Sequence, residues 1–385
     1  MTQSEHRSEE RAEERSEQPA GGRNYTVPVA TVVGEEISGP QVSAERVVFS
    51  FPDPDRVLSG VRLAPALSTS TPLDFRRTRT GWALNFLRPP VRRMEYRLTL
   101  ADADGSCEDF VDPTNPLTAP GAFGDKSVIL FPGYVEPSWL SAPARAGNYT
   151  SLSVPTRGLG GSVEALLWSP EGSSPEKPMP LLVTHDGPEY ERMAGLTRFA
   201  GALIAAGKVP AFRVALVAPG ARNEWYSAKN AYARALVDGV LPAIADLVAV
   251  DGPVVGMGSS LGALAMLHAH RLYPNAFGGL FLQSGSFFDS RLDPQESDFA
   301  RFIRLTRFVL ATRRPAADPH PIPVVLTCGA AEENLGNNRQ ITGALLAQGY
   351  PARMVEVADA HNFIAWRDAL DPALTDLLTT AWSPG

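Results

Sequence analysis

The chain has 385 residues, of which 44% are hydrophobic and 20% are charged, as in a globular protein with room for more than one domain. The formal net charge of −7 offers no basic field for nucleic acid or an anionic membrane surface, so we expect neither as a partner. No apolar stretch is long enough to span a bilayer. The two cysteines, Cys107 and Cys328, are too few for a disulfide framework, and we expect both to be free and buried.

The N-terminal run MTQSEHRSEERAEERSEQPAGGR mixes acidic and basic residues and ends in Pro and Gly. It has no apolar segment, so it does not resemble a secretory signal. Residues 1–24 are therefore expected to be a disordered tail, and the protein is expected to be cytoplasmic.

Between about Val42 and Leu100 the sequence is typical of short strands. Alternating apolar residues occur in ERVVFSF, GVRLA, GWALNFL and MEYRLTL, and Pro, Gly, Asp or Ser separate these segments. No helical period interrupts them. We predict a small immunoglobulin-like β-sandwich domain over residues 25–140.

After residue 141 the pattern changes to strands that alternate with helices. A hairpin is predicted at YTSLSVPT and GSVEALLWSP, and buried strands at PLLVTHDG, FRVALVAPG, GPVVGMG, GGLFLQSGS, IPVVLTCG and ARMVEV. Helical periods lie between them, including AKNAYARALVDGVLPAIADLV, interrupted near its end by Pro242, and a terminal helix FIAWRDALDPALTDLLTTAW. This alternation predicts an α/β domain over 141–385 with a mostly parallel sheet covered on both faces.

A G-x-S-x-G motif formed by Gly258, Ser260 and Gly262 joins a predicted strand to a predicted helix. In this context the pattern places a nucleophilic serine on a sharp turn, and the backbone N–H of Leu261 at the helix start can hold an oxyanion. The alternatives are a turn chosen only for packing, or Ser259 as the nucleophile. Ser260 is favoured because it lies between the two spaced glycines.

A nucleophilic serine needs a base, and the usual chain order in such folds is serine, acid, histidine. His361 fits that order among the six histidines, whereas His185 precedes the serine. Three carboxylates between Ser260 and His361 are candidate acids: Glu332 as the first choice, Glu333 as the second and Asp359 as the third. A structural reading remains open, in which His361 or either glutamate only caps a helix.

The loop VTHDGPEY is expected to supply the second oxyanion donor. Pro188 has no N–H, so the donor is Gly187, Glu189 or Tyr190, with Gly187 as the first choice.

These segments together resemble the enterochelin esterase family, within the esterase D group of α/β hydrolases. The resemblance spans about Pro180 to Trp382 through LLVTHDGPEY, APGARNEWYSAKNAYARALVDGVLPAI, VVGMGSSLGALAML, GGLFLQSGSFF, LTCGAAEENLGNNRQITGALLAQGY and AHNFIAWRDAL. The segment DPTNPLTAPGAFGDKSVILFPGYVEPSWL resembles the end of the early-set domain that precedes the hydrolase in that family.

The resemblance implies Ser260 as nucleophile, His361 as base and Glu332 as acid. It also implies a catecholate trilactone siderophore, ferric or iron-free, as the substrate. The chain departs from the family where Pro188 follows Gly187, and where Asn362 and Phe363 follow His361.

An anionic iron complex needs cationic and aromatic neighbours. The residues expected to contact substrate are Arg222, Arg192, Tyr190, Trp225 and Trp366. Arg222 could instead form a surface pair with Glu224.

The predicted chemistry is ester hydrolysis through an acyl-enzyme, with no metal or organic cofactor beyond iron carried by the substrate. The alternatives are an esterase for carbohydrate or aromatic-acid esters, an acyltransferase of the same fold, and a non-catalytic binding protein. The sequence does not indicate an oligomeric state.

Overall fold

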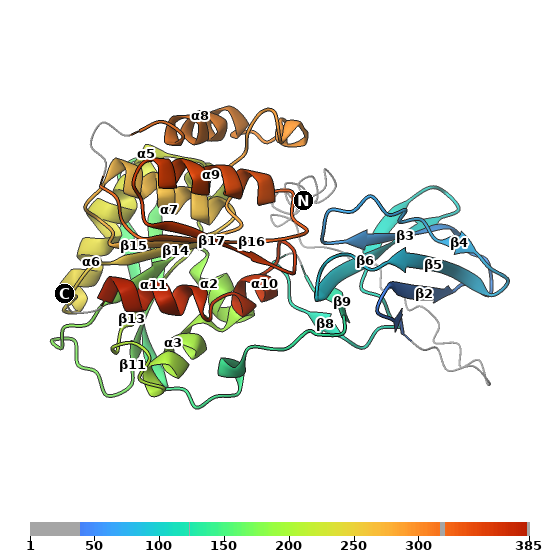
Figure 1. Ribbon diagram of the computed structural model, residues 1–385, viewed down its shortest axis with the longest axis horizontal. Coiled ribbons are helices and arrows are strands. Elements are labelled where there is room, and N and C mark those ends of the chain that lie inside the picture. Colours follow the sequence, from blue (N-terminus) through green and yellow to red (C-terminus); the bar gives the residue numbers. More distant parts are fainter. Residues whose placement is uncertain (1–38, 123, 316–319, 383–385) are drawn as a thin grey trace. The chain divides into compact units, whose positions relative to one another are not determined.

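The computed structural model describes residues 39–122, 124–315 and 320–382, and the chain divides into two compact units, Met1–Tyr134 and Val135–Gly385 (Figure 1). The predicted tail, residues 1–24, lies outside the described residues. The division falls a few residues before the boundary at residue 140 that the sequence predicts.

The first unit consists of antiparallel strands in two sheets. One sheet has the order β1-β2-β5-β4, and the other has the order β3-β6-β9-β8 with β7 paired to β6. The strands are β1 (Gln41–Val42), β2 (Arg46–Pro52), β3 (Leu58–Pro65), β4 (Arg76–Arg77), β5 (Gly81–Leu87), β6 (Arg93–Asp102), β7 (Cys107–Phe110), β8 (Thr118–Ala119) and β9 (Lys126–Leu130).

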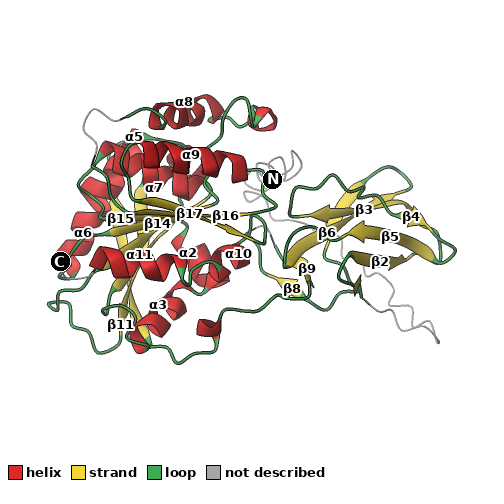
Figure 2. Ribbon diagram, viewed as in Figure 1, coloured by secondary structure: helices red, strands yellow, loops and turns green. Residues whose placement is uncertain are grey.

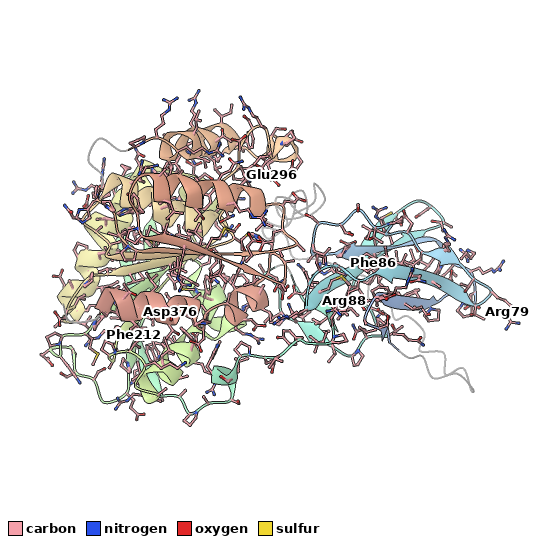
Figure 3. All side chains as sticks on the ribbon, in the orientation of Figure 1. Arg79, Phe86, Arg88, Phe212, Glu296 and Asp376 are labelled. Carbon is pink, nitrogen blue, oxygen red and sulfur yellow. The ribbon has the colours of Figure 1, made fainter. Side chains whose placement is uncertain are left out.

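Alternation along the strands builds the core of this unit. In β2 every second residue is buried, including Val47 and Phe49, because successive side chains of a strand point to opposite faces. The ring of Phe49 meets Tyr96 of the other sheet edge-on at 5.2 Å. Phe86, labelled in Figure 3, is fully buried in the same core. The predicted sandwich is confirmed.

The second unit contains one eight-stranded sheet with the order β10-β11-β13-β12-β14-β15-β16-β17. Strands β10, β11 and β13 pair antiparallel, and the pairs from β13 to β17 are parallel. The strands are β10 (Gly147–Pro155), β11 (Ser162–Pro170), β12 (Leu181–Thr184), β13 (Arg213–Val217), β14 (Val255–Ser259), β15 (Gly279–Gln283), β16 (Val324–Gly329) and β17 (Ala352–Val357).

Helices cover both faces of this sheet (Figure 2). One face is covered by α5 (Asn230–Arg234), α6 (Leu241–Leu247), α7 (Leu261–Leu272) and α9 (Leu335–Ala347), and α8 (Phe302–Thr312) packs outside them against α9. The other packs against α3 (Leu196–Ala205), α10 (Phe363–Asp368) and α11 (Ala373–Trp382), next to the fully buried Phe212 (Figure 3). Short helices α2 (Gly187–Glu189) and α4 (Arg222–Trp225) follow β12 and β13. This is the α/β-hydrolase fold expected from the sequence.

Three local expectations differ from the structure. Pro242 does not end its helix, because the backbone stays helical from α5 through the π-helical segment Ala235–Val240 into α6, and the π turn just before Pro242 accommodates the missing N–H. The terminal helix is two helices, α10 and α11, separated at Asp371 and Pro372. Cys107 is exposed on β7, and only Cys328 is buried. Within the described residues, no helix has the length and apolarity needed to cross a bilayer.

Candidate active site

Ser260 lies on a strained turn between β14 and α7. Its backbone has φ 53° and ψ −125°, a left-handed conformation that non-glycine residues seldom adopt. The glycines of the motif make the turn possible, because a Cβ on Gly258 would lie 2.5 Å from the carbonyl carbon of Gly262. The spacing G-x-S-x-G thus reflects a close crossing of strand and helix, and it leaves Ser260 8% exposed while Ser259 is fully buried.

Hydrogen bonds tie this turn to the loop that follows β15. The N–H of Ser260 donates to the carbonyl of Gln283 at 2.9 Å, and the N–H of Ser286 donates to the carbonyl of Ser260 at 3.1 Å. The two hydroxyls, Ser260 Oγ and Ser286 Oγ, are 3.0 Å apart. Ser286 therefore contacts the candidate nucleophile directly.

His361, in the loop after β17, is paired with Glu332, in the loop after β16. The distance from His361 Nδ1 to Glu332 Oε2 is 2.9 Å, and the side chains are 14% and 2% exposed. Because an ionised carboxylate only accepts hydrogen bonds, this contact assigns the proton to Nδ1 and leaves Nε2 as the basic nitrogen. Glu333 instead accepts from Gln295 at 3.2 Å, and Asp359 accepts from the backbone N–H of Ala360.

The Glu332 carboxylate receives several further donors. Ser284 Oγ and the N–H of Gly329 each donate to Oε1 at 2.7 Å, and the thiol of Cys328 lies 3.6 Å from Oε2. Burial alone would raise the pKa of Glu332, but the charge and hydrogen bond of His361 and the bonds from Ser284 and Gly329 hold it below its usual range. The carboxylate is therefore ionised beside the imidazole.

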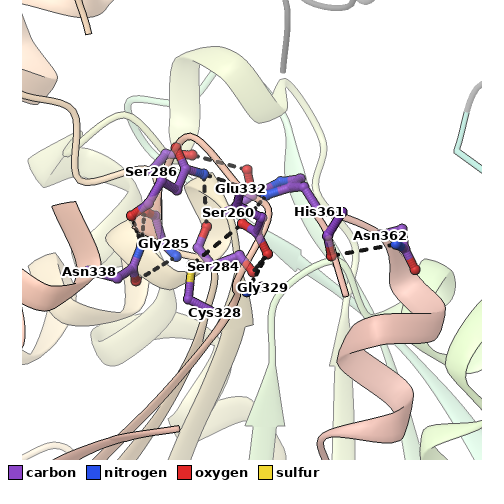
Figure 4. A network of polar contacts seen from close by, with 12 residues as sticks. Ser260, Ser284, Gly285, Ser286, Cys328, Gly329, Glu332, Asn338, His361 and Asn362 are labelled. Atoms are coloured by element: carbon purple, nitrogen blue, oxygen red, sulfur yellow. Dashed lines mark hydrogen bonds and ion pairs between the residues drawn. The ribbon is translucent and has the colours of Figure 1, made fainter. Parts of the chain in front are cut away.

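The four loops that carry these groups follow adjacent parallel strands, so they meet at one edge of the sheet. Figure 4 shows Ser260, Ser284, Glu332 and His361 in one network of polar contacts. Within the described part of the chain, the Ser260 hydroxyl bonds to Ser286, and the imidazole bonds to Glu332. A direct bond between Ser260 and His361 is not made in this conformation.

The loop after β12 packs against the start of α7. His185 Nδ1 lies 2.8 Å from the carbonyl oxygen of Gly262, and Asp186 adopts φ 51° just before Gly187. A Cβ on Gly187 would lie 2.3 Å from the carbonyl carbon of Leu216, so only glycine fits there. The first N–H groups of α7 have no partner within that helix, and the loop that holds Gly187 lies beside them.

Most of the residues that were expected to contact substrate make contacts within the protein instead. Tyr190 is fully buried and donates to Gln283 at 2.8 Å, while the indole of Trp366 donates to Ser284 at 2.9 Å. Trp225 is 7% exposed and stacks on a neighbouring tyrosine, and Arg222 pairs with Asp186 rather than Glu224. These aromatic rings are part of the core, because burying them removes a large apolar area from water. Arg192 is exposed.

Two residues of the network, Ser284 and Ser286, were missed in the sequence. They belong to SGS, which directly follows the buried strand β15. Two serines around a glycine at the carboxyl end of a strand next to the nucleophile strand are the pattern that could have revealed them.

The fold and this geometry define the class of α/β hydrolases with an N-terminal β-sandwich. Residues 156–377 match the family model Esterase, so the chain belongs to the Esterase family.

Among curated proteins, the chain is 32% identical over 151 residues to the iron(III) enterobactin esterase of Dickeya dadantii (strain 3937). That alignment covers 38% of this chain and 34% of the relative, so it spans about a third of the relative's length.

Solved structures share the fold over nearly the whole chain. The enterobactin esterase of Shigella flexneri, in a crystal structure with enterobactin, is 19% identical with a TM-score of 0.70, covering 91% of this chain and 99% of that one. The ferric enterobactin esterase of Salmonella typhimurium is 20% identical with a TM-score of 0.69, covering 89% and 96%. At these identities the likeness concerns the fold.

Proposed function

We propose that this protein is a serine ester hydrolase with Ser260 as nucleophile, His361 as base and Glu332 as the acid that orients the imidazole. The observation that carries the proposal is the buried Glu332–His361 pair, placed at the same sheet edge as the strained turn of Ser260. Membership of the Esterase family supports the same chemistry.

In the proposed reaction, the Ser260 hydroxyl turns from Ser286 toward Nε2 of His361. The imidazole takes the hydroxyl proton as Oγ attacks the ester carbonyl, and Glu332 stabilises the imidazolium. The N–H groups of Leu261 and Gly187 are the proposed oxyanion donors. The imidazolium then protonates the leaving alcohol, and water, deprotonated by the same imidazole, releases the acid and restores Ser260.

For the substrate we propose a catecholate trilactone siderophore or its ferric complex. Support comes from the relatives named for enterobactin, one of them crystallised with that compound. Charge supports it as well, because Glu224, in α4 after β13, contacts three cations, Lys229, Arg301 and Arg304. These ion pairs outweigh the cost of burial and lower the pKa of Glu224 to about 2, so the carboxylate is ionised and a positive surplus remains around it.

We also propose a reducing, cytoplasmic location. Cys107 and Cys328 are both free, and Cys107 is exposed. An exposed free thiol suits a compartment that keeps cysteines reduced.

The experiment compares hydrolysis of iron-loaded and iron-free trilactones with hydrolysis of simple aryl, feruloyl and sugar esters. Ser260→Ala is expected to abolish turnover and labelling by a fluorophosphonate probe. Ser259→Ala is the matched control, because this neighbouring serine is fully buried, and it is expected to keep the label. Retained turnover in Ser260→Ala would disprove the mechanism, and aryl or feruloyl esters preferred over both trilactones would disprove the substrate.

A further inference from the structure

Ser284 lies between the candidate acid and Trp366, which packs on the candidate base. It follows β15 directly, is fully buried and adopts φ 47°. Its Oγ is 2.7 Å from Glu332 Oε1 and 2.9 Å from Nε1 of Trp366. An indole N–H can only donate, so Ser284 Oγ accepts from Trp366 and directs its own proton to Glu332.

Resting on the proposed function, we propose that Ser284 and Trp366 are positioning residues for the triad acid. The Ser284 hydroxyl fixes Oε1 of Glu332, and so holds Oε2 toward His361 Nδ1. Trp366 fixes the direction of the Ser284 hydroxyl and at the same time packs on the imidazole. Neither residue touches the reacting atoms.

The Trp366 indole contacts both the candidate base and the hydroxyl that holds the candidate acid. The rings of His361 and Trp366 meet edge-on, with centroids 5.0 Å apart and an interplanar angle of 82°. The Trp366 ring is itself packed edge-on against Phe363 at 4.8 Å. A shift of Trp366 would therefore move the base and release the hydroxyl that holds the acid.

The backbone of Ser284 indicates that the hydroxyl is needed. A positive φ strains any residue with a Cβ, and such strain persists only where the surroundings impose it. Here the N–H of Ser284 donates to Thr327 at 2.7 Å, and its carbonyl accepts from Asn334 at 3.3 Å. Glycine would adopt this conformation without strain, but it could not donate to Glu332.

The titratable groups around the pair are few. The Cys328 thiol lies beside Glu332 Oε2, and burial raises its pKa, so it is a neutral donor. Glu333 adjoins Glu332 and contacts Gln295, while Asp359 accepts from its own loop. Removal of the Ser284 hydroxyl therefore changes the donors to Glu332 without changing a charge.

The test compares Ser284→Ala with Ser284→Gly, using p-nitrophenyl acetate rather than a siderophore. Both variants lose the hydroxyl, but only the glycine relieves the backbone strain. Without this donor the carboxylate is more basic, so it takes up a proton at higher pH and holds the imidazolium more firmly. We expect kcat to fall about tenfold in both variants, and the acid limb of kcat/KM to move up by about one pH unit. Trp366→Phe keeps an aromatic ring on His361 and should move the limb in the same direction.

Two results would overturn the role of Ser284, and a third would overturn the role of Trp366. If Ser284→Gly has wild-type activity while Ser284→Ala does not, the backbone conformation matters and the hydroxyl does not. If the acid limb stays in place in both variants, Ser284 has only a structural role. If Trp366→Phe alone leaves the limb unchanged, the part assigned to the indole is wrong.

A measurement without catalysis separates this proposal from the proposed function. In the Ser260→Ala background, NMR follows the Nδ1–H proton of His361, assigned by its loss in His361→Gln. The pH at which the His361–Glu332 pair titrates should rise by about one unit when Ser284→Ala is added. A wild type that hydrolyses no ester would refute the function and leave this titration interpretable, whereas an unchanged titration would refute the role of Ser284.

Discussion

Asp186 and Arg222 form a two-point ion pair beside the turn that carries Gly187. Arg222 Nε and Nη2 lie 2.9 and 3.0 Å from the two carboxylate oxygens, and the Asp186 carboxylate is 3% exposed. A guanidinium makes this fork and an ammonium cannot. The pair therefore holds the turn of Asp186, where φ is 51°, in its strained conformation.

We predict that Arg222→Lys lowers kcat for a neutral aryl ester by about 10- to 100-fold, because the Gly187 N–H leaves its place in the proposed oxyanion site. KM for that ester should change little, and steady-state kinetics at saturating substrate would measure the effect. If the variant instead keeps kcat for the neutral ester and raises KM only for an anionic siderophore, Arg222 binds substrate as the sequence suggested.

At the scale of elements, the junction of β14 with α7 depends on how closely strand and helix approach. A Cβ on Gly258 would lie 2.5 Å from backbone atoms of Gly262, which cannot rotate away. A Cβ on Gly343, in the middle of α9, would have no heavy atom within 4 Å. The two glycines, one on β14 and one on α9, thus provide opposite cases within the same unit.

We predict that Gly258→Ala destabilises the protein by about 1–3 kcal/mol through overpacking and greatly reduces esterase activity. Gly343→Ala should stabilise it by up to about 1 kcal/mol, because alanine is the better helix former, and should leave activity unchanged. Urea denaturation and aryl ester hydrolysis would measure both variants. Equal stability of the two would contradict the close packing of the elbow.

For the whole molecule, stability in mild acid depends on buried neutral histidines. His185, His268 and His270 are each nearly or fully buried, and burial is the main cause that lowers the pKa of each from 6.5 to about 4. All three belong to the second unit, and two of them lie on α7.

We predict that stability falls as pH is lowered from about 6.5 toward 4. The folded-state pKa lies below the unfolded value, so the unfolded chain binds protons first in this window. The slope should be at most about 1.4 kcal/mol per pH unit for each histidine. Urea midpoints between about pH 6.5 and 5.5 would measure it. Burial raises the pKa of Glu189 and Asp293, and these two carboxyl groups act in the opposite sense. His268→Gln should reduce the slope, and an unchanged slope would show that His268 is protonated in the folded state.

The larger features of the fold were predictable because their causes are local. Alternation along β2, the change to strand–helix alternation, and the small residues around Ser260 all act between near neighbours in the chain. Predictions from the sequence were wrong where the surrounding structure outweighed the local sequence pattern. Pro242 is accommodated inside a continuous helix by the π-helical segment just before it, and the exposure of Cys107 followed from its place on a short strand.

The candidate site was predictable in its residue types, and less so in its contacts. The sequence by itself determined the order of serine, acid and histidine, and their placement after parallel strands. Only the tertiary structure decided that His361 meets Glu332 rather than its neighbour Glu333, that Arg222 holds Asp186, and that Ser284 and Trp366 meet at the acid. Adjacent glutamates have the same local propensities, so the choice between them depends on how loops that follow distant strands come together. No pattern among neighbouring residues in the sequence indicates which glutamate these loops will place beside His361.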